Sequence, residues 1–105
     1  MNVSIKIDPE TLFLLHKIIS KSAQMIANTR VQKAEKSMRV ELFGIISKRC
    51  ITYSTNPKGK SLTLTLKYHL ADIIWNILDA VQWSYGMYEF NKIEMLKNQL
   101  HQILL

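Results

Sequence analysis

The sequence has few of the residues that cross-link or interrupt small folds. One cysteine among 105 residues excludes an internal disulfide framework and any metal site built from cysteines alone. Three glycines and two prolines exclude collagen-like and low-complexity chains, and a hydrophobic content of 48% excludes an intrinsically disordered one. No apolar run reaches the roughly 18 residues that a membrane span needs. The length fits a single domain over residues 1–105.

The start of the chain does not have the pattern of a secretory signal. Asp8 and Glu10 place acidic groups there, and His16 and Lys17 interrupt the apolar stretch that follows. With a single cysteine, we therefore expect a reducing, cytoplasmic location. The abundance of Lys, Ile and Asn is compatible with a bacterial or phage accessory protein.

Charge is distributed unevenly along the chain, which has a formal net charge of +6. Residues 30–67 hold nine Lys and Arg against two Glu, a net +7, whereas residues 68–105 have a net −2. This asymmetry suggests that the middle binds a polyanion, or that the two regions are complementary across an interface. A solvated surface of mixed charge is the alternative.

Hydrophobic periodicity predicts an α+β, mainly α fold with about four helices and a small two- or three-stranded antiparallel element. Alternating apolar and polar residues predict strands at 3–7 and 62–66, the second preceded by a turn at 56–59. Asp8 and Pro9 mark a helix start, where the Asp8 side chain is expected to cap free N–H groups. Apolar residues three and four apart predict helices at about 9–28, 31–46, 68–83 and 88–104.

Two features of this pattern leave the layout open. The strand-and-helix pattern at 3–19 returns at 62–78, which suggests two pseudo-repeated β-α-α halves with their strands paired. Residues 50–53 are β-branched and aromatic, so they fit either a last helical turn or a short strand. The helical choice favours the repeated layout, and the strand choice favours a winged layout.

Residue types that carry chemistry do not converge in the sequence. His69 and Asp72 are three residues apart on one expected helix, an arrangement that a general base can use, but neither a nucleophile nor a glycine-rich loop accompanies them. Cys50 follows two basic residues that can lower a thiol pKa, yet a small buried apolar role is the more ordinary one. No pattern indicates a metal or another cofactor, and we expect a protein that is not an enzyme.

Two hypotheses about partners follow. The first is a non-enzymatic interaction and assembly protein that forms a homo-oligomer. Its contact surface would combine an aromatic cluster with the heptad-spaced seam of the last helix. The residues of this surface are Trp83, Tyr85, Tyr88, Ile93, Leu96, Leu100 and Ile103. A helix pair within one chain explains the seam equally well.

The alternative is a nucleic-acid-binding protein. Two helices followed by 51–53 and 62–66 around a basic turn loosely resemble a winged helix, although that fold needs three helices before its wing. In this interpretation basic side chains on the second helix and the wing contact phosphates. They are Arg30, Lys33, Lys36, Arg39, Lys58, Lys60 and Lys67. The first four do not form a single stripe when placed at helical steps of about 100°.

Overall fold

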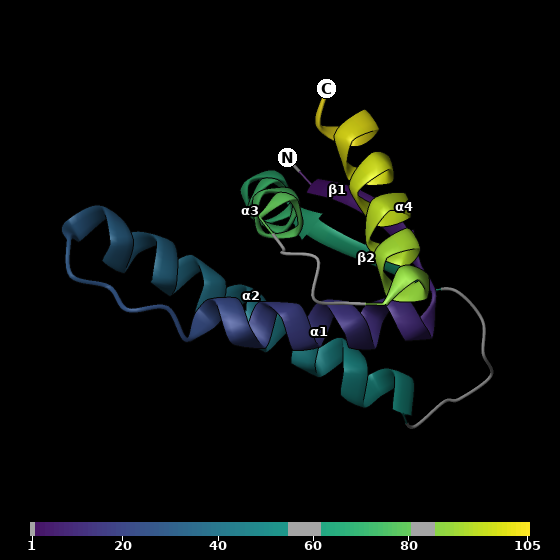
Figure 1. Cartoon of the computed structure of the whole chain (residues 1–105), viewed down its shortest axis with the longest axis horizontal. Helices are drawn as coiled ribbons and strands as arrows, with labels where there is room; N and C mark the ends of the chain where they lie inside the picture. Colours follow the sequence, from purple (N-terminus) through teal and green to yellow (C-terminus); the bar gives the residue numbers. More distant parts are fainter. Residues whose placement is uncertain (1, 55–61, 81–85) are drawn as a thin grey trace.

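In the computed structural model, the described residues form four helices and two strands (Figure 1). The structure describes residues 2–54, 62–80 and 86–105. The elements are β1 (Asn2–Ile7), α1 (Pro9–Ala23), α2 (Arg30–Ser54), β2 (Leu62–Lys67), α3 (Tyr68–Asp79) and α4 (Met87–Leu104). This architecture confirms the predicted α+β, mainly α class, and its element order repeats β-α-α twice.

The two strands form an antiparallel ribbon with one buried face. The two strands pair, as the repeated layout predicts, and the register sets Asn2 opposite Lys67 and Ile7 opposite Leu62. Because side chains alternate between the faces of a strand, one face carries only apolar residues and the other only polar ones. The buried members of the apolar face are Val3, Ile5, Ile7, Leu64 and Leu66.

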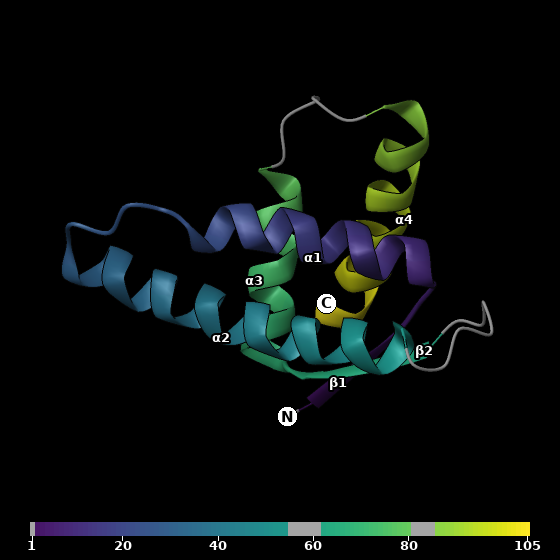
Figure 2. The same ribbon diagram turned by 90° about the horizontal axis from the view of Figure 1, so that it is seen from below.

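Helix α1 lies in the middle of the molecule. It packs against α2 on one side and against α3 and α4 on the other, and α3 and α4 also pack on each other and on the ribbon (Figures 1 and 2). Leu12, Leu15 and Ile19 of α1 are almost completely buried, as are Leu42 and Ile46 of α2. One continuous core therefore joins all six elements.

A capping box at Thr29 and Gln32 marks the start of α2, and α1 ends before its predicted limit. Helix α1 ends at Ala23 rather than near residue 28. The Thr29 hydroxyl accepts the Gln32 backbone N–H at 3.1 Å, and the Gln32 side-chain oxygen accepts the Thr29 N–H at 3.2 Å. This reciprocal pair satisfies two free N–H groups at the start of α2 and so fixes where this helix begins.

The structure resolves the open choice at residues 50–53 in favour of helix. Helix α2 continues to Ser54, because Cys50 falls on the same face as Leu42 and Ile46 and is buried with them. The strand that the winged layout needs at 51–53 is therefore not formed. The predicted turn at 56–59, with Lys58 and Lys60, lies outside the described residues.

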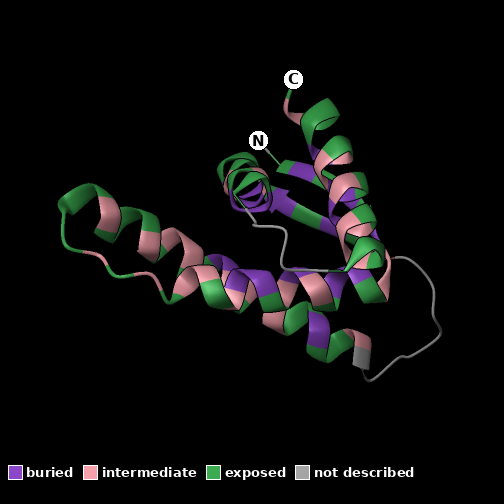
Figure 3. Ribbon diagram, in the orientation of Figure 1, coloured by how far each residue is buried: buried purple, intermediate pink, exposed green. Residues whose placement is uncertain are grey.

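A helical arm projects from the body. It comprises residues 20–41, which are the end of α1, the connection and the first half of α2 (Figure 3). None of these residues is buried, whereas α1 and α2 are well buried nearer the body. The arm extends along the long axis of the molecule, which measures 43 Å against 28 Å in the other directions. Within the described residues, the arm contributes no side chain to the buried core.

Candidate interaction surfaces

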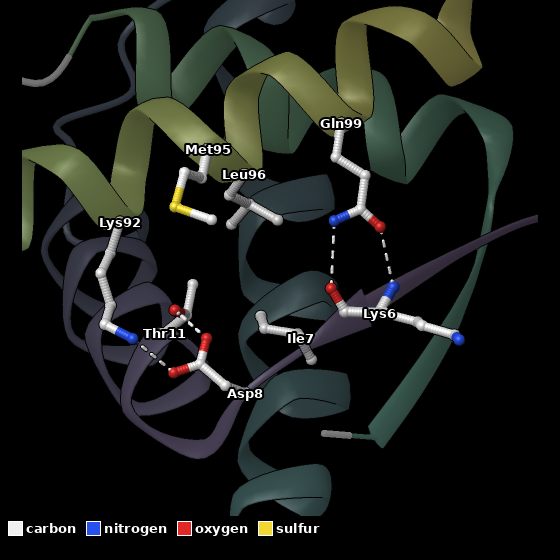
Figure 4. Close-up of a pocket in the computed structure, with 8 residues that line it drawn as sticks. All are labelled: Lys6, Ile7, Asp8, Thr11, Lys92, Met95, Leu96 and Gln99. Carbon is white, nitrogen blue, oxygen red and sulfur yellow. Dashed lines mark hydrogen bonds and ion pairs between the residues drawn. The ribbon is translucent and has the colours of Figure 1, made fainter. Parts of the chain in front are cut away.

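Helix α4 is fastened to the N-terminal strand by one glutamine. The Lys6 backbone N–H donates to the Gln99 side-chain oxygen at 2.9 Å, and the Gln99 amide donates to the Lys6 carbonyl at 3.0 Å (Figure 4). Gln99 thus satisfies one donor and one acceptor on the open edge of β1, as a neighbouring strand would. This double hydrogen bond fixes the rotation of α4 about its own axis.

An ion pair next to Gln99 joins α4 to the start of α1. Lys92 Nζ lies 2.7 Å from one carboxylate oxygen of Asp8, and the Thr11 hydroxyl donates to the other (Figure 4). Burial alone would raise the pKa of Asp8, but the hydrogen bonds from Lys92 and Thr11 outweigh it and lower that pKa. The bond with Asp8 raises the pKa of Lys92. The Asp8 side chain makes no capping bond to α1, which corrects the sequence prediction.

Tyr88 is held in a fixed position although its side chain is exposed. Its hydroxyl donates a hydrogen bond to Glu10, and this bond raises the pKa of the phenol by stabilising its protonated form. Lys92 lies 5.3 Å from the centre of the Tyr88 ring and 3.7 Å from Glu10. These contacts restrict the orientation of the aromatic ring.

One line of exposed residues along α4 carries no charge. Its residues follow heptad spacing, and every one of them is exposed. Met95 is 73% exposed and Leu105, just after the helix, is 90% exposed. We call this surface the outer stripe of α4, and it consists of Tyr88, Asn91, Met95, Asn98, Gln102 and Leu105.

The lysines of α4 are turned away from the outer stripe. Lys92 pairs with Asp8, and Lys97 pairs with Asp79 at 3.0 Å and with Glu94 at 3.6 Å. Lys97 also lies 5.9 Å from the ring centre of Trp75. Both lysines are therefore paired with carboxylates of the same chain, and they lie beside the outer stripe and not within it.

The heptad seam predicted from the sequence lies on the opposite side of α4. Ile93, Leu96 and Leu100 are buried in the chain's own core, so the intramolecular explanation holds for them. Ile103 is 36% exposed at the end of that face. Among the predicted aromatic anchors, Tyr88 is exposed on the outer stripe, while Trp83 and Tyr85 lie outside the described residues.

Sequence reasoning missed five members of the outer stripe: Asn91, Met95, Asn98, Gln102 and Leu105. A signal was present, because these positions repeat at spacings of three and four and include no charged residue. Asn and Gln are ordinarily assigned to a solvated face, and the predicted seam of the last helix was based on the spacing of its aliphatic residues. A helix can carry two heptad registers, and its packing decides which of them is buried.

A small hollow lies between α4, β1 and the start of α1, beside Met95 (Figure 4). Its volume is about 120 Å³, and its polar lining comes from Lys6, Asp8, Thr11, Lys92 and Gln99. The hydrogen bonds among these groups leave no buried polar side-chain atom without a partner in the described part of the chain. The arrangement is suited to holding α4 in place.

The candidate general base is not assembled. His69 and Asp72 are both exposed and form neither a hydrogen bond nor an ion pair with each other within the described ranges. Asp72 instead lines a second hollow, of about 200 Å³, with Trp75, His101 and the C-terminal leucines. The Trp75 and His101 rings are 6.2 Å apart there. These contacts join the ends of α3 and α4.

His16 and Cys50 have structural surroundings. His16 Nε2 lies 2.9 Å from the Ser47 hydroxyl, and its ring stacks on Phe43 with centres 4.9 Å apart. Cys50 is buried, and that burial raises its thiol pKa, which disfavours the reactive thiolate. No group of three residues able to hold a metal ion occurs in the parts of the chain that the structure describes.

The basic residues predicted to bind nucleic acid separate into two regions. Arg30, Lys33 and Lys36 lie on the arm, and Arg39 turns toward α1, where it donates to the Ser22 hydroxyl at 2.9 Å. Lys67 lies at the end of β2, on the polar face of the ribbon. Within the described residues, the structure therefore places three of these cations on the outward part of the arm.

Comparison of the chain with protein-family models, with curated proteins and with solved structures gives no match. Within the described residues, none of the helices combines the length and the apolar character needed to cross a membrane. The proposals below therefore rest on the geometry and charge of this chain.

Proposed function

We propose that this protein is a non-enzymatic assembly protein that forms a homo-oligomer through the outer stripe of α4. The observation that carries the proposal is an exposed, uncharged helix face on a chain with a net charge of +6. Two copies can bring this face together without opposing like charges. Tyr88 and Met95 supply the apolar contact area, and Tyr88 is already held in place by Glu10.

An antiparallel pairing of two α4 helices makes the stripe self-complementary. With the two-fold axis between Met95 and Asn98, these two residues lie opposite each other across the axis. The same symmetry sets Asn91 opposite Gln102 and places Tyr88 opposite Leu105. The two outer pairs then match amide with amide and apolar group with apolar group, while Met95 contacts the Asn98 amide next to the axis. The same patch is used by both copies, as an isologous dimer interface requires.

The non-enzymatic part of the proposal is supported by how the polar groups are used. His69 and Asp72 are exposed and separate, and the groups around the hollow beside Met95 are bonded to one another. A catalytic site usually holds a strained or perturbed group facing a cavity. In the described ranges, the perturbed pKa values of Asp8, Lys92 and Tyr88 arise from the contacts that hold α4 in place.

The proposal is tested by light-scattering chromatography from about 5 µM to about 500 µM, a range in which weak dimers respond to mass action. The expected mass is twice the 12.2 kDa of one chain. Met95→Glu places two carboxylates at the centre of the interface and should yield monomer. Ile26→Glu is the matched control, because Ile26 is an aliphatic residue on the arm that is 80% exposed.

A pair of complementary charges introduced at two neutral positions tests the antiparallel geometry. In a chain that carries both Met95→Glu and Asn98→Lys, each new carboxylate faces a new ammonium group on the other copy, so the dimer should return. A wild-type chain that stays monomeric at the highest concentration would refute self-association. A Met95→Glu chain that still dimerises would show that α4 is not the interface.

A further inference from the structure

Helix α2 concentrates the positive charge of the described chain. It carries six cationic residues against Glu35 and Glu41, a net +4, whereas α3 and α4 together have a net −2. The arm presents the first half of this helix to solvent (Figure 3). The six cations are Arg30, Lys33, Lys36, Arg39, Lys48 and Arg49.

These cations have no anionic partner within the described residues. All four ion pairs there involve Lys92 or Lys97 of α4. Arg39 is hydrogen-bonded to Ser22, which is uncharged. The contrast between the two helices is informative, because α4 uses its lysines inside the chain and α2 leaves its positive charge available to a partner.

Four of the cations lie on one side of α2. At about 100° per residue, Arg30 and Lys48 point in the same direction, and Lys33 and Lys36 lie within about 120° of them. Arg30, Lys33 and Lys48 are exposed, and Lys36 is half-buried. Glu41 lies next to Arg30 and Lys48 on this side of α2, so the net charge of this side is +3. At about 1.5 Å per residue, Arg30 and Lys48 are about 27 Å apart along the axis.

We propose that this outward side of α2 binds the phosphate backbone of a nucleic-acid duplex. The four cations span most of one duplex turn, which measures about 34 Å. Between them lies Gly44, where a Cβ atom would meet nothing within 4 Å, so the backbone of the helix can approach a bulky partner. The contacts are to phosphates, and binding is therefore independent of base sequence.

The distribution of charge favours a duplex over an anionic membrane. A membrane-inserting tip would gather its cations around the exposed Ile26 and Val31, but here they continue along α2 to Lys48. A long, regularly charged polymer matches cations spread along a rigid helix. This binding uses a different helix from the outer stripe of α4 and does not depend on self-association.

The test is fluorescence anisotropy with a labelled DNA duplex of arbitrary sequence, measured at several salt concentrations. Four phosphate contacts predict that affinity falls about 150-fold between about 50 mM and about 200 mM salt. The variant Arg30→Gln, Lys33→Gln, Lys36→Gln should flatten the slope of log K against log salt by about 3. Circular dichroism of this variant checks that its helices are retained.

A matched variant separates a defined surface from net charge alone. Lys6→Gln, Lys17→Gln, Lys67→Gln removes the same charge from exposed positions on α1 and the ribbon, and should leave the salt slope nearly unchanged. Equal losses in both variants would overturn the proposal, as would no binding at about 50 mM salt. Tighter binding to anionic vesicles or polyglutamate than to the duplex would overturn it in favour of a membrane or an acidic protein.

Discussion

The ion pair between Asp8 and Lys92 should stabilise the fold by a measurable amount, because it joins residues at opposite ends of the chain. Its atoms are 2.7 Å apart, and the side chains are 37% and 23% exposed. An exposed pair contributes about 0.2–1 kcal/mol, and a charged hydrogen bond shielded from water about 1.5–3 kcal/mol. The pair lies between these cases, so we expect a coupling of about 1 kcal/mol.

The perturbation is a double-mutant cycle built from Asp8→Asn and Lys92→Met. These changes remove the charges while keeping the amide shape at one site and the apolar stem at the other. Urea unfolding followed by circular dichroism measures the free energy of unfolding of the four chains. A parallel cycle on Asp79 and Lys97 is the internal comparison, because Asp79 is 56% exposed and the expected coupling is about half as large.

The dependence on pH follows from the two shifts. The folded pKa of Asp8 is lowered, so its contribution is complete above the unfolded value of about 3.9 and is lost as pH falls through the folded pKa. The folded pKa of Lys92 is raised, so its contribution is complete below about 10.4 and is lost as pH rises through the folded pKa. The coupling should therefore be constant from about pH 5 to about pH 9.

Two results would refute this reasoning. One is a coupling below about 0.3 kcal/mol at neutral pH, the level at which independent sites are additive. The other is a destabilisation by Asp8→Asn that does not diminish as the pH falls below the unfolded Asp pKa of about 3.9. Either result would mean that the aliphatic part of the Lys92 side chain provides its contact and that the ion pair does not contribute to the free energy of unfolding.

Two further substitutions test the packing by urea unfolding. Gly44→Ala should stabilise the protein by about 0.5–1 kcal/mol, because the new methyl group meets no neighbour and alanine favours helix, and a loss of stability would show that this face is covered. Leu100→Ala should cost about 2–5 kcal/mol because Leu100 is fully buried, whereas Ile103→Ala, at the edge of the same face, should cost less than about 1.5 kcal/mol. Equal costs would contradict the placement of α4.

Local sequence signals predicted most of the secondary structure. Strict alternation around Ile5 and Leu64 determined both strands, because a ribbon with one buried face leaves that pattern. The antiparallel pairing followed from the repeated layout and is confirmed. Thr29 and Gln32 form a capping-box pattern, which indicates in the sequence that a new helix begins there. The predicted range of the first helix was too long because it was based on apolar spacing alone.

Tertiary contacts decided the features that matter most for the candidate surfaces. Cys50 belongs to α2 because its position continues the buried face of Leu42 and Ile46, which local β-propensity opposes. The outward face of α4 is set by Gln99 and Lys92, whose partners Lys6 and Asp8 lie more than 80 residues away in the chain. A helix with two usable heptad registers cannot select between them by itself.

The fold class, the strand pairing and the uneven charge could all be predicted from the residues alone, because each leaves a periodic or compositional trace. The exposure of residues 20–41 and of the uncharged stripe of α4 could not, because exposure depends on what packs over a residue in the folded chain. Neighbouring elements in this chain cover Leu100 completely and leave Met95, five residues earlier on the same helix, in water.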